Sequence, residues 1–167
     1  MRLTLVLCLS LSFYAVPALA QAPAGPPPCS AAEHRQFDFW VGTWDVRVAG
    51  NVAGGNEITL EEDGCVLHEH WRGSQGGTGQ SFNFYDRAAK QWRQVWIDSG
   101  GNPLDLWGGL VEGKMVLVGK TATPKGSARQ RITWSQNGDG SVRQLWESST
   151  DDGNTWAVSF DGTYRKR

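Results

Sequence analysis

Turn signals recur along this chain at short intervals, and they constrain its fold more than any other feature of the sequence. They are runs rich in Gly, Asn and Asp, the residues that tight turns favour. They lie at residues 50–51, 63–64, 73–77, 99–102, 112–113, 125–126, 137–140 and 152–153. The segments between them are short, rich in Val, Ile, Trp, Phe and Thr, and alternate between apolar and polar residues. About ten strands are therefore expected, and short turns can join only antiparallel neighbours.

A meander of this size is expected to close into a barrel, because an open sheet would twist and would leave two edges unpaired. The predicted fold class is thus all-β, a single antiparallel meander β-barrel that spans residues 30–167. One short helix is expected before the first strand, over Ala31 to about Phe39, since Ser30 and Glu33 have the spacing of a capping box. A chain of 167 residues is long enough for one domain with its own core.

The N-terminal residues have the form of a secretory signal. Arg2 gives a basic start, Leu3 to Val16 is almost wholly apolar, and residues 18–20 supply small residues for cleavage. The apolar run is shorter than the ~20 residues that span a bilayer. We therefore expect residues 1–20 to be a signal peptide, with export to the periplasm or the medium and no membrane association after cleavage. Residues 21–29, rich in proline, are expected to form an extended linker.

The charge balance and the known enzyme motifs exclude several function classes. The chain has 16 Lys and Arg against 17 Asp and Glu, and the basic residues do not cluster, so nucleic acid is not an expected partner. Gly-x-Ser-x-Gly, a phosphate loop, a dinucleotide fingerprint and His-Glu-x-x-His are all absent. We accordingly expect no cofactor.

Two cysteines, Cys29 and Cys65, remain outside the predicted signal peptide. An exported protein meets an oxidising compartment, so we predict a disulfide between them. The bond would close a loop of ~35 residues and contribute on the order of 3 to 4 kcal/mol. Two buried free thiols are the alternative.

The stretch around Gly42-Thr43-Trp44 resembles the Gly-x-Trp signature of lipocalins and their calycin relatives. In those proteins a helix caps one barrel end and the tryptophan packs against it. Similarity extends through FDFWVGTWDV, GCVLHEHW, SFNFYD, WRQVWID, RQLWESSTDDGNTW and FDGTY, and it is to a family of exported bacterial calycin-like proteins of unknown function. The resemblance implies the barrel, with Phe37, Phe39, Trp40 and Trp44 as a plug, and implies no activity. Nitrobindin-type haem barrels are also similar, but their late haem-ligating histidine has no counterpart after His70.

The strand register around a turn at residues 63–64 decides which side chains face inward. It pairs Thr59 with His68 and Glu57 with His70, because side chains two residues apart share a face. The expected outer face carries Glu57, Thr59, Glu61, His68, His70 and Arg72, and the inner face carries Ile58, Leu60, Cys65, Leu67 and Trp71. His68 and His70 have a spacing that could chelate zinc or copper, yet their face is a solvated one. We therefore predict no metal site.

The same register turns Glu69 inward at mid-strand. A carboxylate there is costly unless it meets a donor, a cation or a ligand. Glu69 is thus the first candidate functional residue and the one candidate catalytic group. A carboxylate satisfied by a buried hydrogen-bond network is an equal alternative.

Two similar strand segments, around Arg93-Gln94 and Arg143-Gln144, complete the predicted lumen. Arginine is rarely buried unpaired, so the Gln and Trp sides are expected to face inward. The predicted ligand-binding residues are Glu69, Trp71, Asn83, Tyr85, Trp92, Gln94, Trp96, Gln144 and Trp146. Two alternatives remain open: the tryptophans simply fill the barrel, or Phe82 and Phe84 face inward instead.

The sequence therefore predicts an exported protein that binds a small molecule inside a barrel, with ligand and oligomeric state unspecified. An acid/base enzyme of isomerase or cyclase type, using Glu69 with Tyr85 or Asp98, is the second hypothesis. A protein-interaction module with exposed aromatics such as Trp107 is the third. Ser149 to Trp156 is similar to the Asp-box, S-x-D-x-G-x-T-W, which implies a structural hairpin.

Overall fold

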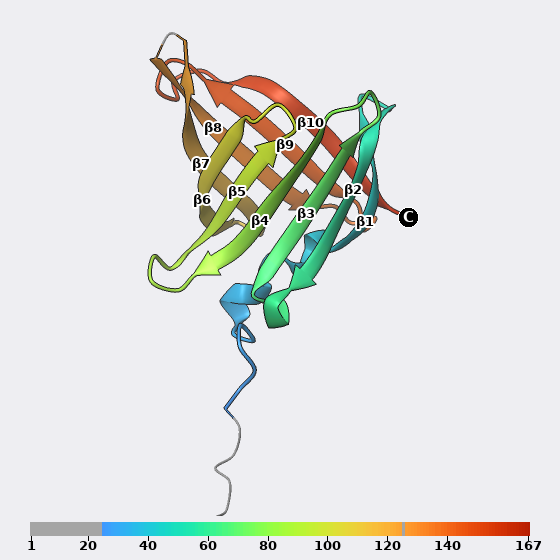
Figure 1. Cartoon of the computed structure of the whole chain (residues 1–167), viewed down its shortest axis with the longest axis vertical. Helices are drawn as coiled ribbons and strands as arrows, with labels where there is room; N and C mark the ends of the chain where they lie inside the picture. The colour runs from blue at the N-terminus through green and yellow to red at the C-terminus, as the bar shows by residue number, and fades with distance from the viewer. Residues whose placement is uncertain (1–24, 125) are drawn as a thin grey trace, which may run out of the picture.

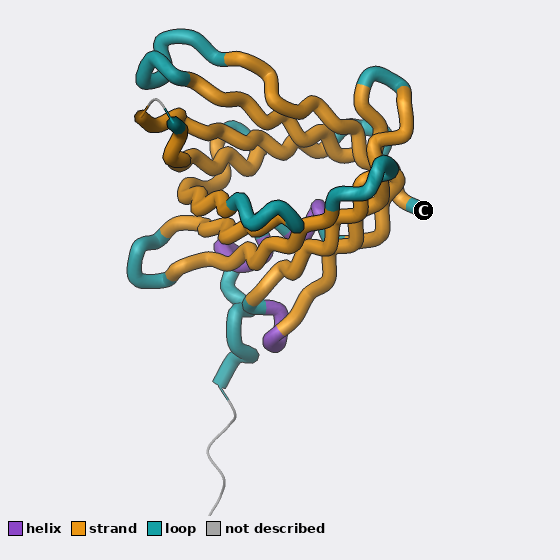
Figure 2. Tube along the Cα trace, turned by 45° about the horizontal axis from the view of Figure 1, so that its top comes forward, coloured by secondary structure: helices purple, strands orange, loops and turns teal. Residues whose placement is uncertain are grey.

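The computed structural model describes residues 25–124 and 126–167. Within them, ten strands form one closed antiparallel barrel (Figures 1 and 2). The strands are β1 (Gly42–Val48), β2 (Asn51–Glu61), β3 (Val66–Gly73), β4 (Thr78–Asp86), β5 (Gln91–Asp98), β6 (Pro103–Val111), β7 (Lys114–Thr123), β8 (Gly126–Gln136), β9 (Val142–Ser149) and β10 (Ala157–Lys166). The predicted signal peptide and the start of the predicted linker lie outside the described residues. No helix in the described part of the chain is both long and apolar enough to cross a membrane.

Each strand pairs with the next along the chain, and β1 pairs with β10 to close the ring. This confirms the all-β meander barrel. Two-residue turns carry the tightest hairpins: Ala49 and Gly50 have φ of 48° and 82°, and Glu112 and Gly113 have φ of 49° and 77°. Two consecutive residues with positive φ are the requirement of the type I′ turn, whose twist matches that of the flanking strands.

The predicted register of β2 and β3 is confirmed, since Thr59 pairs with His68 and Glu57 with His70. Ile58, Leu67 and Trp71 lie on the inner face as expected. Cys65 precedes β3 and belongs to the turn, and Leu60 is only partly covered. Leu60 keeps 39% of its surface exposed. It is the last inward position of β2, just before the short 3-10 turn η3 (Glu62–Gly64). Leu60 therefore lies at the end of the barrel, where the side chain is less covered.

The predicted single helix before β1 is replaced by two short 3-10 turns, η1 (Ala32–Arg35) and η2 (Asp38–Trp40). The capping box does not form: η1 begins after Ala31 without a side-chain cap, and Ser30 Oγ donates to the carbonyl of Pro27 instead. Side chains three residues apart lie on the same side of a 3-10 turn. This geometry points both Phe37 and Trp40 into the barrel.

Phe37, Trp40 and Trp44 are fully buried and plug one end of the barrel. The rings of Phe37 and Trp40 stack at 5.1 Å between centroids, and Trp44 Nε1 donates to the carbonyl of Trp40 at 2.9 Å. Trp92 and Trp134 complete the cluster, with ring centroids 5.6 and 5.1 Å from that of Phe37. We call these five residues the plug.

A disulfide joins Cys29 to Cys65, as predicted, with the two Cα atoms 5.1 Å apart. It connects the segment before η1 to the start of β3 at the plugged end of the barrel, where Figure 1 shows the N-terminal segment entering. Arg35 Nη2 adds a hydrogen bond to the carbonyl of Gly64 in η3. The short turns η1 and η3, which lie at this end of the barrel, are therefore linked to each other.

Candidate functional site

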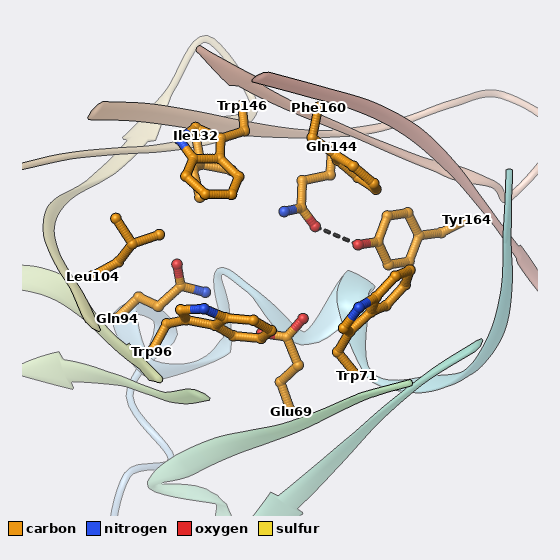
Figure 3. A pocket seen from close by; sticks show the side chains of 10 residues that line it. All are labelled: Glu69, Trp71, Gln94, Trp96, Leu104, Ile132, Gln144, Trp146, Phe160 and Tyr164. Atoms are coloured by element: carbon orange, nitrogen blue, oxygen red, sulfur yellow. Dashed lines mark hydrogen bonds between the residues drawn. The ribbon is translucent and has the colours of Figure 1, made fainter. Parts of the chain in front are cut away.

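A cavity of about 140 Å³ lies inside the barrel on the other side of the plug (Figure 3). Its lining comes from six of the ten strands. The lining residues are Glu69, Trp71, Gln94, Trp96, Leu104, Ile132, Gln144, Trp146, Phe160 and Tyr164. A second hollow of about 440 Å³ shares Trp96, Leu104 and Trp146 with it and adds residues from the strand ends and turns beyond them. Because the two hollows share these three residues, we interpret the second as the mouth of the cavity.

Two tryptophans of the lining lie flat against the wall because glycines make room for them. A Cβ atom added to Gly79 would lie 2.2 Å from the ring of Trp96, and one added to Gly54 would lie 2.8 Å from the ring of Trp71. The geometry repeats. Trp96 pairs with Ser81 and leans toward Gly79, two residues earlier on β4, and Trp71 pairs with Asn56 and leans toward Gly54 on β2.

A third ring of the lining uses a glycine of its own strand. A Cβ atom added to Gly162 would lie 2.4 Å from the ring of Phe160 on β10. Rings that cover wall glycines are a recurrent way to stabilise β-sheets. Here the same arrangement keeps three rings out of the centre of the barrel, and the space that they leave is the cavity.

Glu69 reaches the cavity from β3 and is held there by two neutral donors. Asn56 Nδ2 donates to Glu69 Oε1 at 2.7 Å, and Ser81 Oγ donates to Glu69 Oε2 at 2.6 Å. Ser81 Oγ itself accepts from Asn83 Nδ2 at 2.8 Å and from Gln94 Nε2 at 3.4 Å. These two contacts orient the single hydroxyl proton of Ser81 toward the carboxylate.

Burial raises the pKa of Glu69 from 4.5 to about 7, while the hydrogen bonds from Ser81 and Asn56 act in the opposite direction. Burial also raises the pKa of Tyr164, and the nearby Glu69 carboxylate adds to this effect. Near neutral pH, the lining therefore holds one carboxyl group that exchanges its proton easily and one phenol that stays protonated.

The amide lining is fixed by hydrogen bonds behind it. Gln144 Oε1 accepts from Tyr164 Oη at 2.5 Å, the bond drawn in Figure 3, and from Trp134 Nε1 of the plug at 3.2 Å. Trp146 Nε1 donates to Gln130 Oε1 at 2.7 Å. These contacts hold the lining in place without a ligand, which is the pre-organisation that binding sites use.

Six of the nine predicted site residues lie on the cavity: Glu69, Trp71, Gln94, Trp96, Gln144 and Trp146. Asn83 lies behind it and holds Ser81. The structure places the other two elsewhere. Trp92 belongs to the plug, where its Nε1 donates to the carbonyl of Glu33 at 3.1 Å, and Tyr85 packs edge-on against His34 with ring centroids 5.2 Å apart. Both positions follow from the alternation, but they fall on the plugged end of their strands.

Four lining residues were not predicted, namely Leu104, Ile132, Phe160 and Tyr164, and neither was Asn56 as a partner of Glu69. The FDGTY motif carried a usable signal for two of them. Alternation puts Phe160, Gly162 and Tyr164 on one face of β10, and that face pairs with the Gln144 and Trp146 face of β9. Leu104 and Ile132 carry no chemical signal beyond being apolar.

The remaining candidates from the sequence lie outside the cavity. Phe82, with 47% of its surface exposed, and the stacked His68 face outward, and this settles the facing of β4. His68 Nδ1 and His70 Nε2 lie 3.2 Å apart, but residues 25–124 and 126–167 contain no group of three potential ligands able to hold a metal ion. Asp98 is bound to Asn102 and to the backbone of its own turn. Trp107 packs under the guanidinium of Arg93 at 4.5 Å.

The predicted Asp-box forms the β9–β10 hairpin as a closed hydrogen-bond system. Ser149 Oγ donates to Asp151 Oδ1 at 2.7 Å and accepts from the Gly153 backbone at 2.8 Å, and Thr155 Oγ1 donates to Asp151 Oδ2 at 2.6 Å. Trp156 packs below the loop under the guanidinium of Arg131 at 4.0 Å. The structural interpretation of this motif agrees with the contacts.

No known family model matches the chain, and a search of curated proteins finds no match.

Proposed function

We propose that this protein binds one small molecule inside its barrel, with Glu69, Trp71, Gln94, Trp96, Gln144 and Trp146 in contact with the ligand. The proposal depends on one observation: the barrel contains a cavity with a buried carboxyl group on its wall. Ligand sites combine ring surface with a few fixed polar groups, and this lining has both. An engineered apolar cavity of about 150 Å³ is known to bind benzene, so the volume corresponds to one ring.

The test is binding of single-ring compounds to the wild-type protein and to a variant with a filled cavity. Leu104→Trp adds ring volume to the lining and is expected to lower affinity by at least about tenfold. Val118→Trp is the matched control, because Val118 lies on β7 with 48% of its surface exposed. Native mass spectrometry of all three proteins, followed by denaturation, also identifies any compound retained from the cell. Equal binding by wild type and Leu104→Trp would place the ligand outside the cavity.

A second candidate function is proton-transfer catalysis, which the pKa of about 7 for Glu69 favours. Its expected partners do not support it: Asp98 is held in the β5–β6 turn and Tyr85 packs near the plug. A binding role fits the observed geometry better, because Glu69 then needs no second acid or base beside it.

We also propose that the protein is exported and related to the calycin-like barrels. The disulfide supports export, because such bonds persist in oxidising compartments. The closed ten-stranded barrel, with Gly42 and Trp44 at the start of β1 and the plug beneath, supports the relation. Mass analysis of the protein recovered from the producing cell tests export: a chain that keeps residues 1–20 would contradict it.

A further inference from the structure

We propose that the ligand of this cavity is a small organic cation, an amine or quaternary ammonium attached to a body of about one ring. The proposal rests on the proposed binding function and names its ligand class. It follows from three features of the described residues: the polarity of the groups around Glu69, the missing counter-charge, and the rings of the lining.

The groups around Glu69 are arranged to receive a positive partner. Both carboxyl oxygens accept hydrogen bonds, from Asn56 and from Ser81, and such bonds favour the ionised form. The remaining oxygen of the same amide, Asn56 Oδ1, is a buried acceptor without a partner. Asn56 lies behind the lining, so the group that the cavity itself presents is the Glu69 carboxyl, which a cation or an N–H donor would complement.

No protein group in the described part of the chain supplies that positive charge. The ion pairs of residues 25–124 and 126–167 all lie at the surface or near the plugged end, and none includes Glu69. The lining itself contains no Lys, Arg or His. A buried carboxylate without a counter-ion is costly, so a cationic ligand would offset the cost of burying the Glu69 carboxylate.

The rest of the lining is suited to the same class of ligand. Trp71, Trp96, Trp146, Phe160 and Tyr164 surround the space in front of Glu69 (Figure 3). Aromatic faces attract ammonium groups, and Trp does so most strongly. An anionic ligand would meet the carboxylate and these ring faces, both of which repel it. The cavity of about 140 Å³ limits the body of the ligand to about one ring.

Three soluble probes with the same ring and nearly the same chain test the proposal: phenethylamine as its cation, neutral phenethyl alcohol, and anionic phenylacetate. Titrations at about pH 8 keep the amine protonated and Glu69 mostly ionised. We expect the cation to bind at least about tenfold more tightly than the alcohol, and phenylacetate to bind most weakly. Glu69→Gln is expected to abolish the preference for the cation, whereas Glu57→Gln, on the exposed face of β2, is expected to retain it.

A pH series on the wild-type protein gives a second test that needs no variant. Benzyltrimethylammonium keeps its charge at every pH, so its affinity should rise through the pKa of about 7 of Glu69 and then level off. Tyr164, from β10, has its pKa raised and stays neutral throughout. Asp98, at the mouth, has its pKa lowered by hydrogen bonds from Asn102 and stays ionised. His68 acts on Glu69 from the outer face of β3, so His68→Gln should leave the profile in place.

The outcomes separate the ligand class from the binding function. Tight binding of phenethyl alcohol or phenylacetate with no preference for the cation would overturn the ligand class and leave the binding function standing. Affinity for the neutral probe that rises as the pH falls would do the same, because it would show protonated Glu69 acting as a donor. Failure of every probe to bind the wild-type protein, with no compound retained from the cell, would overturn both.

Discussion

Glu69 is the residue on which most of the chemistry of this barrel depends. Its side chain is 4% exposed, and its two neighbours of opposite parity, His68 and His70, lie on the outside of the same strand. Alternation alone predicted that its side chain points inward. Thr59 pairs with His68 on the outer face, and the next residue of the strand, Glu69, must then face the interior. Its hydrogen-bond partners could not be predicted with equal ease. Asn56 and Ser81 come from strands on either side, and only the three-dimensional register brings both amide and hydroxyl to one carboxylate.

The free energy of unfolding should depend on pH in a way that reflects the titration of Glu69. The pKa of Glu69 rises from 4.5 to about 7 on folding, so proton binding by Glu69 stabilises the folded protein. This contribution to the free energy of unfolding is fully present below pH 4.5 and is lost as the pH rises through about 7. That shift corresponds to about 3 kcal/mol. We expect the free energy of unfolding of Glu69→Gln, relative to wild type, to increase by this amount between pH 4.5 and pH 8. Urea unfolding at a series of pH values measures it.

The comparison between variant and wild type is needed because His34 acts in the opposite sense. Burial lowers the pKa of His34 from 6.5, so this residue makes the protein more stable as the pH rises. His34 is present in both proteins, and its contribution cancels in the difference. Glu57→Gln serves as the control and should follow the wild-type curve. A difference between Glu69→Gln and wild type that does not change with pH would contradict the raised pKa.

The strand pairs β2–β3 and β4–β5 set the shape of the cavity through their glycines. Gly79→Ala should push the ring of Trp96 into the lumen, since the added Cβ would lie 2.2 Å from it. We expect a loss of about 1–3 kcal/mol in stability from the overpacking and a loss of ligand binding in the folded protein. Gly109→Ala is the matched control, because a Cβ at Gly109 meets nothing within 4 Å. Calorimetry gives both quantities, and unchanged binding by Gly79→Ala would show that Trp96 moves elsewhere.

The short turns η1 and η2 act as one element with the barrel end that they fill. Phe37→Ala should cost about 3–5 kcal/mol, because the lost ring contacts Trp40, Trp92 and Trp134 and leaves a void behind. Phe82→Ala, on the outer face, should cost less than about 1 kcal/mol. Chemical denaturation of the two variants measures the difference. Similar costs for the two phenylalanines would mean that the N-terminal turns contribute little to the stability of the barrel.

At the scale of the whole molecule, the disulfide acts on the unfolded chain more than on the cavity. Replacing Cys29 and Cys65 together by Ser should lower the free energy of unfolding by about 3–4 kcal/mol, because the loop of ~35 residues is no longer closed in the unfolded state. The bond lies at the plugged end, away from the lining of the cavity, so ligand affinity of the folded variant should match that of wild type. Thermal unfolding and a binding titration on the same sample test the two statements separately. A weakened affinity would reveal coupling between the two ends.

The sequence predicted the barrel well and its interior only in part, for a physical reason. Strand order and facing follow from turn residues and from a period of two, which are local properties. The position of a side chain along the barrel axis is not local: Trp92 and Trp96 share a face of β5, yet one lies in the plug and the other on the cavity. The cavity itself depends on which ring covers a glycine of a neighbouring strand. Single-strand alternation carries no information on that.

The plug leaves the two ends of the barrel unequal, and both ends of the described chain lie at the closed one. The N-terminal segment leads directly into η1, and Lys166 lies over the ring of Trp44 at 5.3 Å. A tag, a second domain or a solid support attached at either end of the described residues would therefore lie on the side away from the mouth. An immobilised array of this barrel would present every opening to the solution.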